Sequence, residues 1–237
     1  MINVEHLTKR YRRHTAVDDV SFTCGPGTVT GFLGPNGAGK STTLRMLTGL
    51  TPPTAGRATI AGVSYRDLPN PGRVVGVMLD ASAQHAGRTG IETLRLAALM
   101  LGLPRTDADA MLERIGLDGA GGRRVADYSL GMRQRLGIGT ALLGDPAVLV
   151  LDEPANGMDP EGIRWMRHLL RGVADDGGTV LLSSHLLAEV QAMADRLVIM
   201  SRGKVVADDR LDTLVSRHGA GAGLEDLFIH LTTGAAA

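Results

Sequence analysis

Short apolar runs alternate along the chain with longer segments in which apolar residues recur at helical spacing. An unbroken apolar run of strand length is typical of a strand buried on both faces, as in a parallel sheet covered by helices. The pattern therefore predicts an α/β fold with a mostly parallel core sheet and helices on both of its faces. The expected core strands are Thr28–Leu33, Val74–Leu79, Ala147–Leu151, Thr179–Ser183 and Leu197–Met200.

Two regions depart from this alternation. Residues 1–27 are expected to form short strands with a turn at Gly25–Gly27, and Arg57–Val63 adds a strand after a Pro-Pro turn. Together they predict a small antiparallel β subdomain beside the core. Residues from about 86 to 145 are mostly helical in pattern, which predicts an inserted α-helical subdomain. Its expected helices are Ile91–Leu101, Asp107–Ile115 and Leu130–Leu143.

The composition is that of a folded, globular protein, because 237 residues with 43% hydrophobic content can bury a sizeable core. The 25 basic and 25 acidic side chains cancel, which disfavours a protein that wraps a polyanion. The single cysteine, Cys24, excludes an intramolecular disulfide and a cysteine-rich metal site, which fits a reducing cytosol. The start lacks a signal-peptide pattern, and no apolar run approaches the roughly 20 residues that span a bilayer, so we expect the chain not to cross a membrane.

The segment from Gly34 to Ser41 fits the phosphate-loop pattern G-x-x-x-x-G-K-[ST], between an apolar strand and an expected helix. Its glycines let backbone N–H groups converge on phosphate oxygens, and the helix N-terminus adds a favourable dipole. Lys40 is expected to reach the β and γ phosphates of ATP, and the Ser41 hydroxyl to ligate Mg²⁺. The predicted phosphate-binding residues are Gly34, Pro35, Asn36, Gly37, Ala38, Gly39, Lys40, Ser41 and Thr42.

Two adjacent carboxylates, Asp152 and Glu153, follow the apolar run that ends at Leu151. We expect Asp152 to hold Mg²⁺ directly or through water, and Glu153 to polarise the water that attacks the γ phosphate. On its own this segment would be an ordinary strand that ends at a polar turn. The phosphate loop is what favours the catalytic interpretation.

A further segment lies just ahead of the acidic pair, and it reads Tyr128-Ser129-Leu130-Gly131-Met132-Arg133-Gln134-Arg135-Leu136. It resembles the signature motif of ABC-type ATPases, although in isolation it would be only a capped amphipathic helix. Ser129 is a good N-cap, so its hydroxyl and nearby N–H groups can form an anion site. The resemblance implies that Ser129, Gly131 and Met132 close on a γ phosphate held by the opposite subunit.

The resemblance covers residues 2 to about 208 and implies an ABC-type ATPase domain, with a P-loop NTPase fold and a RecA-like core sheet. It implies that Tyr11 stacks on adenine with Val17 nearby, that Asp159 lies at the dimer interface, and that His185 contacts the γ phosphate. Without the resemblance, Tyr11 would be an unremarkable residue on a strand edge and His185 a solvated loop residue.

Residues 209–237 are expected to form a short helical tail, too short for another domain. A helix is expected near Leu224–Leu231, and Thr232–Ala237 should fray.

Three features depart from the family pattern. Asp80 stands where the family usually carries a glutamine, and a carboxylate can still ligate Mg²⁺ but cannot donate a hydrogen bond when ionised. The signature has Leu130 in place of its first usual glycine and Met132 in place of glutamine, as in some drug-export members. The interface loop reads Asn-Gly-Met-Asp rather than Ser-Ala-Leu-Asp, which keeps Asp159 in register.

The resemblance implies an ATPase subunit that dimerises head to tail around two ATP-Mg²⁺, with itself or with a homologue, and drives a separate membrane permease. The permease is expected to dock beside Asp80 and Gln84–Arg95, which places the chain in the cytoplasm at the inner face of the cell membrane. The signature, the interface loop and the terminal Leu-Glu-Asp-Leu-Phe look most like bacterial exporters of drugs and antibiotics.

Two alternatives stay open. A soluble ABC-type ATPase acting on ribosomes or nucleic acid could use the basic segment Lys9–Arg13. Such proteins by resemblance carry two ATPase halves or long coiled-coil arms, so no nucleic-acid partner is expected. A non-catalytic nucleotide sensor would bind ATP without turnover, which the presence of Glu153 and His185 argues against.

Overall fold

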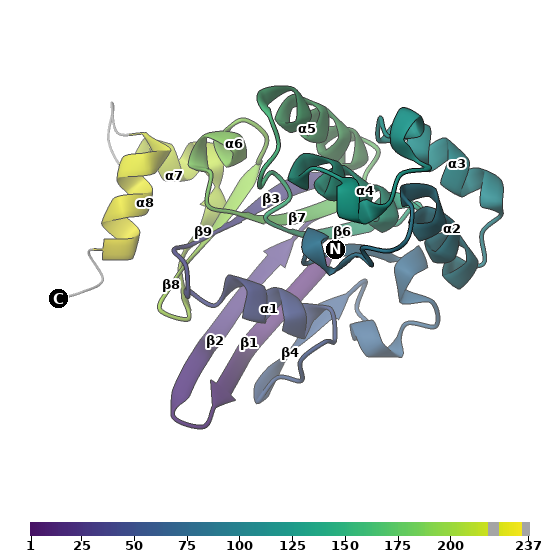
Figure 1. Cartoon of the computed structure of the whole chain (residues 1–237). Helices are drawn as coiled ribbons and strands as arrows, with labels where there is room; N and C mark the ends of the chain where they lie inside the picture. The colour runs from purple at the N-terminus through teal and green to yellow at the C-terminus, as the bar shows by residue number, and fades with distance from the viewer. Residues whose placement is uncertain (218–222, 234–237) are drawn as a thin grey trace.

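The computed structural model describes residues 1–217 and 223–233. Across these residues a six-stranded sheet has the order β5-β6-β7-β3-β8-β9 (Figure 1). Its first five strands are parallel, and β9 pairs antiparallel with β8. The bounds are β3 Thr28–Leu33, β5 Val75–Met78, β6 Val148–Asp152, β7 Thr179–Ser184, β8 Arg196–Ser201 and β9 Lys204–Arg210. The predicted core strands are thereby confirmed, whereas β9 was not predicted and runs past the domain boundary expected at about residue 208.

A second, antiparallel sheet has the order β2-β1-β4, with β1 Ile2–Tyr11, β2 His14–Cys24 and β4 Ala55–Ile60. The prediction of short strands in residues 1–27 is wrong, because β1 and β2 have 10 and 11 residues and form one long hairpin. Register shifts within the hairpin interrupt the two-residue alternation that marks a long strand in sequence. β4 ends before the expected Val63, because Ile60 and Val63 exchange backbone hydrogen bonds of 2.8 and 3.0 Å across a turn.

The helices lie around and beside the core sheet (Figure 1). Between β5 and β6 the chain forms α2, α3 and α4, which pack against one another. Among the residues described, none of the helices combines the length and the apolar character that a membrane crossing requires. The bounds are α1 Lys40–Leu47, α2 Gly90–Leu101, α3 Arg105–Arg114, α4 Leu130–Leu142, α5 Pro160–Asp175, α6 Leu187–Gln191, α7 Leu211–Arg217 and α8 Leu224–Thr233, with 3₁₀ turns η1 Tyr65–Asp67, η2 Pro71–Arg73, η3 Ala81–Ala83, η4 Asp118–Ala120 and η5 Val125–Asp127.

The fraying expected from Thr232 onward is wrong for Thr232 and Thr233. Both belong to α8, where their hydroxyls donate to the carbonyls of Phe228 and Ile229 at 2.7 and 2.6 Å. The expectation for residues 234–237 lies outside the described residues.

The core sheet buries its two faces in two different hydrophobic cores, because neighbouring side chains of a strand point to opposite faces. Leu149 and Leu151 of β6 pack in one core with residues of α4 and α5. Val148 and Val150 pack in the other, with residues of α1 and of the antiparallel sheet. The prediction of helices on both faces therefore needs one correction, since the antiparallel sheet shares the cover of the second face with α1.

Leu149 is fully buried in β6. Leu149→Ala should lower the free energy of unfolding by about 2–5 kcal/mol, because it removes apolar contacts and leaves a cavity. Urea unfolding followed by circular dichroism measures this loss. The control Leu99→Ala makes the same change on α2, at a side chain that is 74% exposed, and should cost less than about 0.5 kcal/mol. An equal loss of unfolding free energy at the two positions would contradict the burial of Leu149 in the core.

Candidate active site

The phosphate loop joins the end of β3 to the start of α1, and two of its glycines have backbone angles that other residues rarely adopt. Gly37 has φ +80° and Gly39 has φ +105°. A Cβ on Gly39 would lie 2.5 Å from the carbonyl oxygen of Ala16, so this position also lacks room for a side chain. A Cβ on Gly34 would lie 2.6 Å from the carbonyl oxygen of Met200, so both fixed glycines of the pattern, Gly34 and Gly39, are required by the structure.

A cleft of about 430 Å³ opens over this loop. It brings Tyr11, which is 48% exposed, to the same hollow as Lys40, Ser41 and Glu153. Gly34 does not line it, and neither does Val17, which is fully buried in the core. Val17 packs behind the cleft, where its Cγ2 would lie 3.3 Å from a Cβ on Gly39, and the neighbouring Ala16 lines the cleft. The lining residues are Tyr11, His14, Ala16, Pro35, Asn36, Gly37, Ala38, Gly39, Lys40, Ser41, Thr42 and Glu153.

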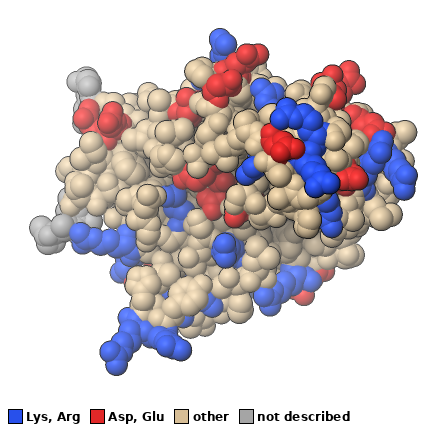
Figure 2. Space-filling view, in the orientation of Figure 1, with Lys and Arg blue, Asp and Glu red and all other residues tan. Residues whose placement is uncertain are grey.

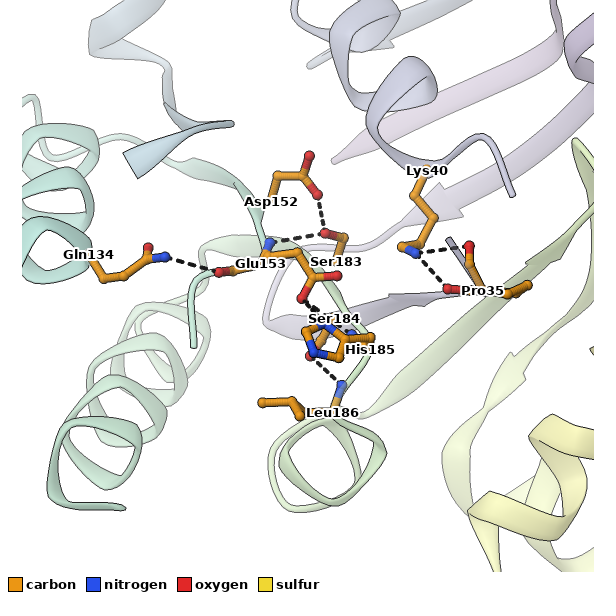
Figure 3. A network of polar contacts seen from close by, with 10 residues as sticks. Pro35, Lys40, Gln134, Asp152, Glu153, Ser183, Ser184, His185 and Leu186 are labelled. Atoms are coloured by element: carbon orange, nitrogen blue, oxygen red, sulfur yellow. Dashed lines mark hydrogen bonds and ion pairs between the residues drawn. The ribbon is translucent and has the colours of Figure 1, made fainter. Parts of the chain in front are cut away.

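Lys40 is a buried cation held by its own loop. Its Nζ donates to the carbonyl oxygens of Gly34 at 2.5 Å and Pro35 at 3.4 Å (Figure 3). Burial lowers the pKa of Lys40, and the nearby carboxylates of Glu153 and Asp152 oppose that shift. The ammonium group therefore lies in a partly dry site and close to both acids.

The acidic pair is fixed from the adjacent strand. Asp152, the last residue of β6, lies opposite Ser183 of β7. The buried Ser183 hydroxyl donates to Asp152 Oδ1 and accepts from the Glu153 N–H at 3.1 Å (Figure 3). One hydroxyl thus orients both acidic residues.

Glu153 has φ +50°, in the left-handed region, which costs a non-glycine residue about 1–3 kcal/mol. Its Oε2 lies 2.7 Å from His185 Nδ1 and accepts from the His185 N–H at 3.3 Å (Figure 3). The Gln134 Nε2 donates to the Glu153 carbonyl oxygen at 3.4 Å. Contacts from α4, from β7 and from the loop that follows β7 therefore hold this residue in a strained conformation.

Four residues of the signature-like segment line a separate hollow of about 260 Å³, and none of the segment lines the cleft over the phosphate loop. Ser129 Oγ accepts from the Met132 N–H at 3.2 Å and caps α4, as predicted. Asp159 Oδ1 accepts from the Gly162 N–H at 2.7 Å and caps α5. We name this the Ser129 hollow, and its lining residues are Ser129, Gly131, Met132, Arg135, Gly157, Met158, Asp159 and Gly162.

Asp80 lines neither of these hollows. Its Oδ1 accepts from the N–H and the hydroxyl of Ser82 at 2.7 and 2.6 Å, which caps the turn η3. These hydrogen bonds lower the pKa of Asp80, so the carboxylate is ionised at neutral pH. A metal role for Asp80 would therefore use its other carboxylate oxygen, Oδ2, or require Oδ1 to leave Ser82.

Sequence patterns did not reveal Ser183 and Gln134. Ser183 lies inside the predicted strand Thr179–Ser183, and Gln134 lies inside the predicted helix Leu130–Leu143. For both residues a polar side chain at a position expected to be buried was a signal, because such a side chain requires a partner. Gln134 also belongs to the signature-like segment.

Residues 17–156 of the chain match the model of a protein family that is described as ABC transporter. The uncharacterized ABC transporter ATP-binding protein YhcH of Bacillus subtilis is 41% identical over 209 residues, which are 87% of this chain and 68% of that protein. The bacitracin transport ATP-binding protein BcrA of Bacillus licheniformis is 38% identical, over 92% of this chain and 72% of that protein. The lantibiotic transport ATP-binding protein SrtF of Streptococcus pyogenes is 34% identical, over 90% of this chain and 92% of that protein.

The solved structures that are similar to this chain include an ATP-binding subunit and an ATP-binding cassette. The ATP-binding subunit of an ABC transporter matches with a TM-score of 0.89 and 31% identity, over 98% of this chain and 99% of that chain. An ATP-binding cassette dimer bound to ADP and Pi has a TM-score of 0.81 at 22% identity, over 89% of this chain and 98% of that chain. This likeness concerns the fold alone. The predicted fold class is confirmed.

Lys40→Ala should weaken ATP binding by roughly 10- to 100-fold, because a charge-assisted hydrogen bond contributes about 1.5–3 kcal/mol. Isothermal titration calorimetry with ATP measures the change. Lys204→Ala is the matched control, since Lys204 is 65% exposed and pairs with Asp18 away from the cleft. Equal affinity in the two variants would show that Lys40 does not reach the phosphates.

Asp80→Gln should retain hydrolysis but change the Mg²⁺ concentration at which the rate is half-maximal, because it replaces a charged carboxylate ligand with a neutral carbonyl oxygen. Titration of ATPase rate against Mg²⁺ tests this, with Asp67→Gln in η1 as the control. If the Mg²⁺ titration is unchanged, Asp80 serves only to cap η3.

Proposed function

Because the chain belongs to the ABC transporter family, we propose that it is the ATP-hydrolysing subunit of a transporter that exports antibiotics or drugs through a separate permease. The observation that carries the proposal is the meeting of Tyr11, Lys40 and Glu153 at one cleft. A phosphate loop alone would fit any nucleotide-binding protein. The carboxylate held by His185 adds the group that turnover requires.

Hydrolysis transfers the γ phosphoryl group to water, so the protein must orient the water, receive its proton and stabilise charge on the phosphate. Glu153 is the proton acceptor, and its contact with His185 sets the direction of the carboxylate. Lys40 exchanges the carbonyl oxygens of Gly34 and Pro35 for phosphate oxygens, which form stronger charge-assisted hydrogen bonds. The exposed ring of Tyr11 stacks on the adenine.

Ser41 and Asp152 fit a Mg²⁺ ion, because hydroxyl and carboxylate oxygens are the ligands that this cation prefers. When bound, Mg²⁺ would neutralise charge on the β and γ phosphates. No group of three or more His, Cys, Asp or Glu side chains in the described part of the chain could hold a metal by itself. The two residues would therefore hold the ion together with phosphate and water oxygens.

The separation of the two hollows supports a dimer. The cleft over the phosphate loop carries the groups for chemistry, while the Ser129 hollow offers the capped start of α4. A head-to-tail pair of chains, or a pair with a homologue, places each Ser129 hollow over the nucleotide of the other chain. ATP then joins the two surfaces and hydrolysis releases them.

The cargo proposal rests on relatives, since two of the similar proteins are named for bacitracin and lantibiotic transport. The permease docks beside Asp80 and Gln84–Arg95, which keeps the chain at the cytoplasmic face of the membrane.

A soluble ABC-type ATPase acting on ribosomes or nucleic acid is the second candidate. It is favoured by the Lys and Arg side chains at the tip of the β1–β2 hairpin, residues 9–13 (Figure 2).

Glu153→Gln should bind ATP, fail to turn it over and accumulate as a dimer, because an amide keeps the shape of the side chain but does not accept the proton. Light scattering after size exclusion, with and without ATP, measures the dimer. The double variant Lys40→Ala/Glu153→Gln is the control and should stay monomeric. A monomeric Glu153→Gln chain in saturating ATP would oppose the dimer proposal.

The same Glu153→Gln chain, tagged and expressed in its source cell, tests the transport proposal. Mass spectrometry should find a multi-spanning membrane protein in near-equal amount after purification from solubilised membranes. Ribosomal proteins or nucleic acid in its place, with the chain absent from membranes, would keep the ATPase and overturn transport.

A further inference from the structure

The side chain of Gln134 touches the main chain of the catalytic base, and the proposed mechanism gives it no role. Gln134 lies in the second turn of α4 and is only 5% exposed. Its Nε2 is directed at the Glu153 carbonyl oxygen, 3.4 Å away (Figure 3). The contact joins the helix that begins at the Ser129 hollow to the residue that receives the proton.

The chemistry of the amide shows which end faces Glu153. A carbonyl oxygen only accepts hydrogen bonds, so Nε2 must face it, because Oε1 would be repelled. The Gln134 Oε1 is buried and finds no hydrogen-bond partner among the described residues. A buried, unpaired acceptor destabilises the folded state, and a methionine of similar length would avoid it. Stability alone therefore does not account for a glutamine here.

Glu153 needs to be held, because its φ of +50° is unfavourable for a residue with a side chain. The peptide group before its Cα is fixed by Ser183, whose carbonyl and hydroxyl oxygens lie 3.2 and 3.1 Å from the Glu153 N–H. The peptide group after its Cα is fixed by Gln134. Contacts on both sides of the Cα set the direction in which the carboxylate leaves the backbone.

The segment that carries Gln134 is itself anchored. The Gln84 Nε2 donates to the Arg133 carbonyl oxygen at 3.0 Å. The Arg133 guanidinium donates to the carbonyl oxygens of Val125 and Ala126 at 3.2 and 3.0 Å. These hydrogen bonds therefore hold the helix backbone next to Gln134 in place.

We propose that Gln134 is a positioning residue for ATP hydrolysis, which holds the left-handed backbone at Glu153 so that the carboxylate is aligned with the attacking water. This inference rests on the proposed ATPase function. Gln134 lies outside the cleft lining, so it acts on the chemical step through Glu153 and not on the nucleotide. Loss of alignment lowers the rate of the chemical step and leaves binding unchanged.

Gln134→Met tests the proposal, because it removes the donor and keeps the length of the side chain. The turnover rate kcat should fall by roughly 10- to 100-fold, while KM for ATP and the melting temperature stay close to those of the unmodified chain. In the Glu153→Gln background, Gln134→Met should still form the ATP-dependent dimer at the same ATP concentration. Gln134→Leu, also without a donor, serves if the methionine variant does not fold.

The control is Thr140→Val, which removes a hydroxyl that donates to the Leu136 carbonyl oxygen at 2.8 Å in the same helix and does not touch Glu153. Its kcat should stay within about twofold of the unmodified chain. An unchanged kcat in Gln134→Met would overturn the proposal. So would a parallel loss of kcat, ATP affinity and melting temperature, which indicates general loosening of α4. If the unmodified chain binds ATP without hydrolysing it, the proposed function itself fails.

Discussion

The register of three neighbouring parallel strands, β6, β7 and β3, brings the groups of the site together. Both faces of these strands are buried, so a slip by one residue would move every side chain into the wrong core. In this register Asp152 lies opposite Ser183, and Leu33 opposite Ser184. The acidic pair, His185 and the phosphate loop therefore emerge at the same edge. Hydrophobic burial places them there, and the polar contacts at the edge only orient them.

At this edge opposite charges lie near one another without a direct ion pair between Lys40 and the acids. Lys40 Nζ donates to carbonyl oxygens of its own loop, and Glu153 contacts His185. A direct salt bridge in a partly buried site would be costly to break when nucleotide arrives. Neutral carbonyl oxygens are weaker partners for an ammonium group than phosphate oxygens. The arrangement keeps Lys40 close to its target while leaving it free to exchange partners.

The sequence predicts those features that depend on residues close together along the chain. The core strands, the phosphate loop and the cap at Ser129 are of this kind. Ser183 and Gln134 lie 30 and 19 positions from Glu153, inside segments that a strand or a helix already explains. Ala16 lines the cleft whereas Val17 is buried, because successive side chains of β2 point to opposite faces, and a pattern match does not fix which face a cleft occupies.

Helix α4 connects the two parts of the site within one chain. Its first turn forms the Ser129 hollow, and its second turn contacts the Glu153 carbonyl through Gln134. In the proposed dimer, closure of the Ser129 hollow on one nucleotide therefore acts on the helix that holds the base for the other nucleotide. Coupling of this kind requires an element with two arrangements. The strained backbone of Glu153, at φ +50°, is the feature in this site that depends on its contacts to persist. If Gln134 positions Glu153 as proposed, the contact from α4 would link occupancy of one cleft of the proposed dimer to chemistry in the other.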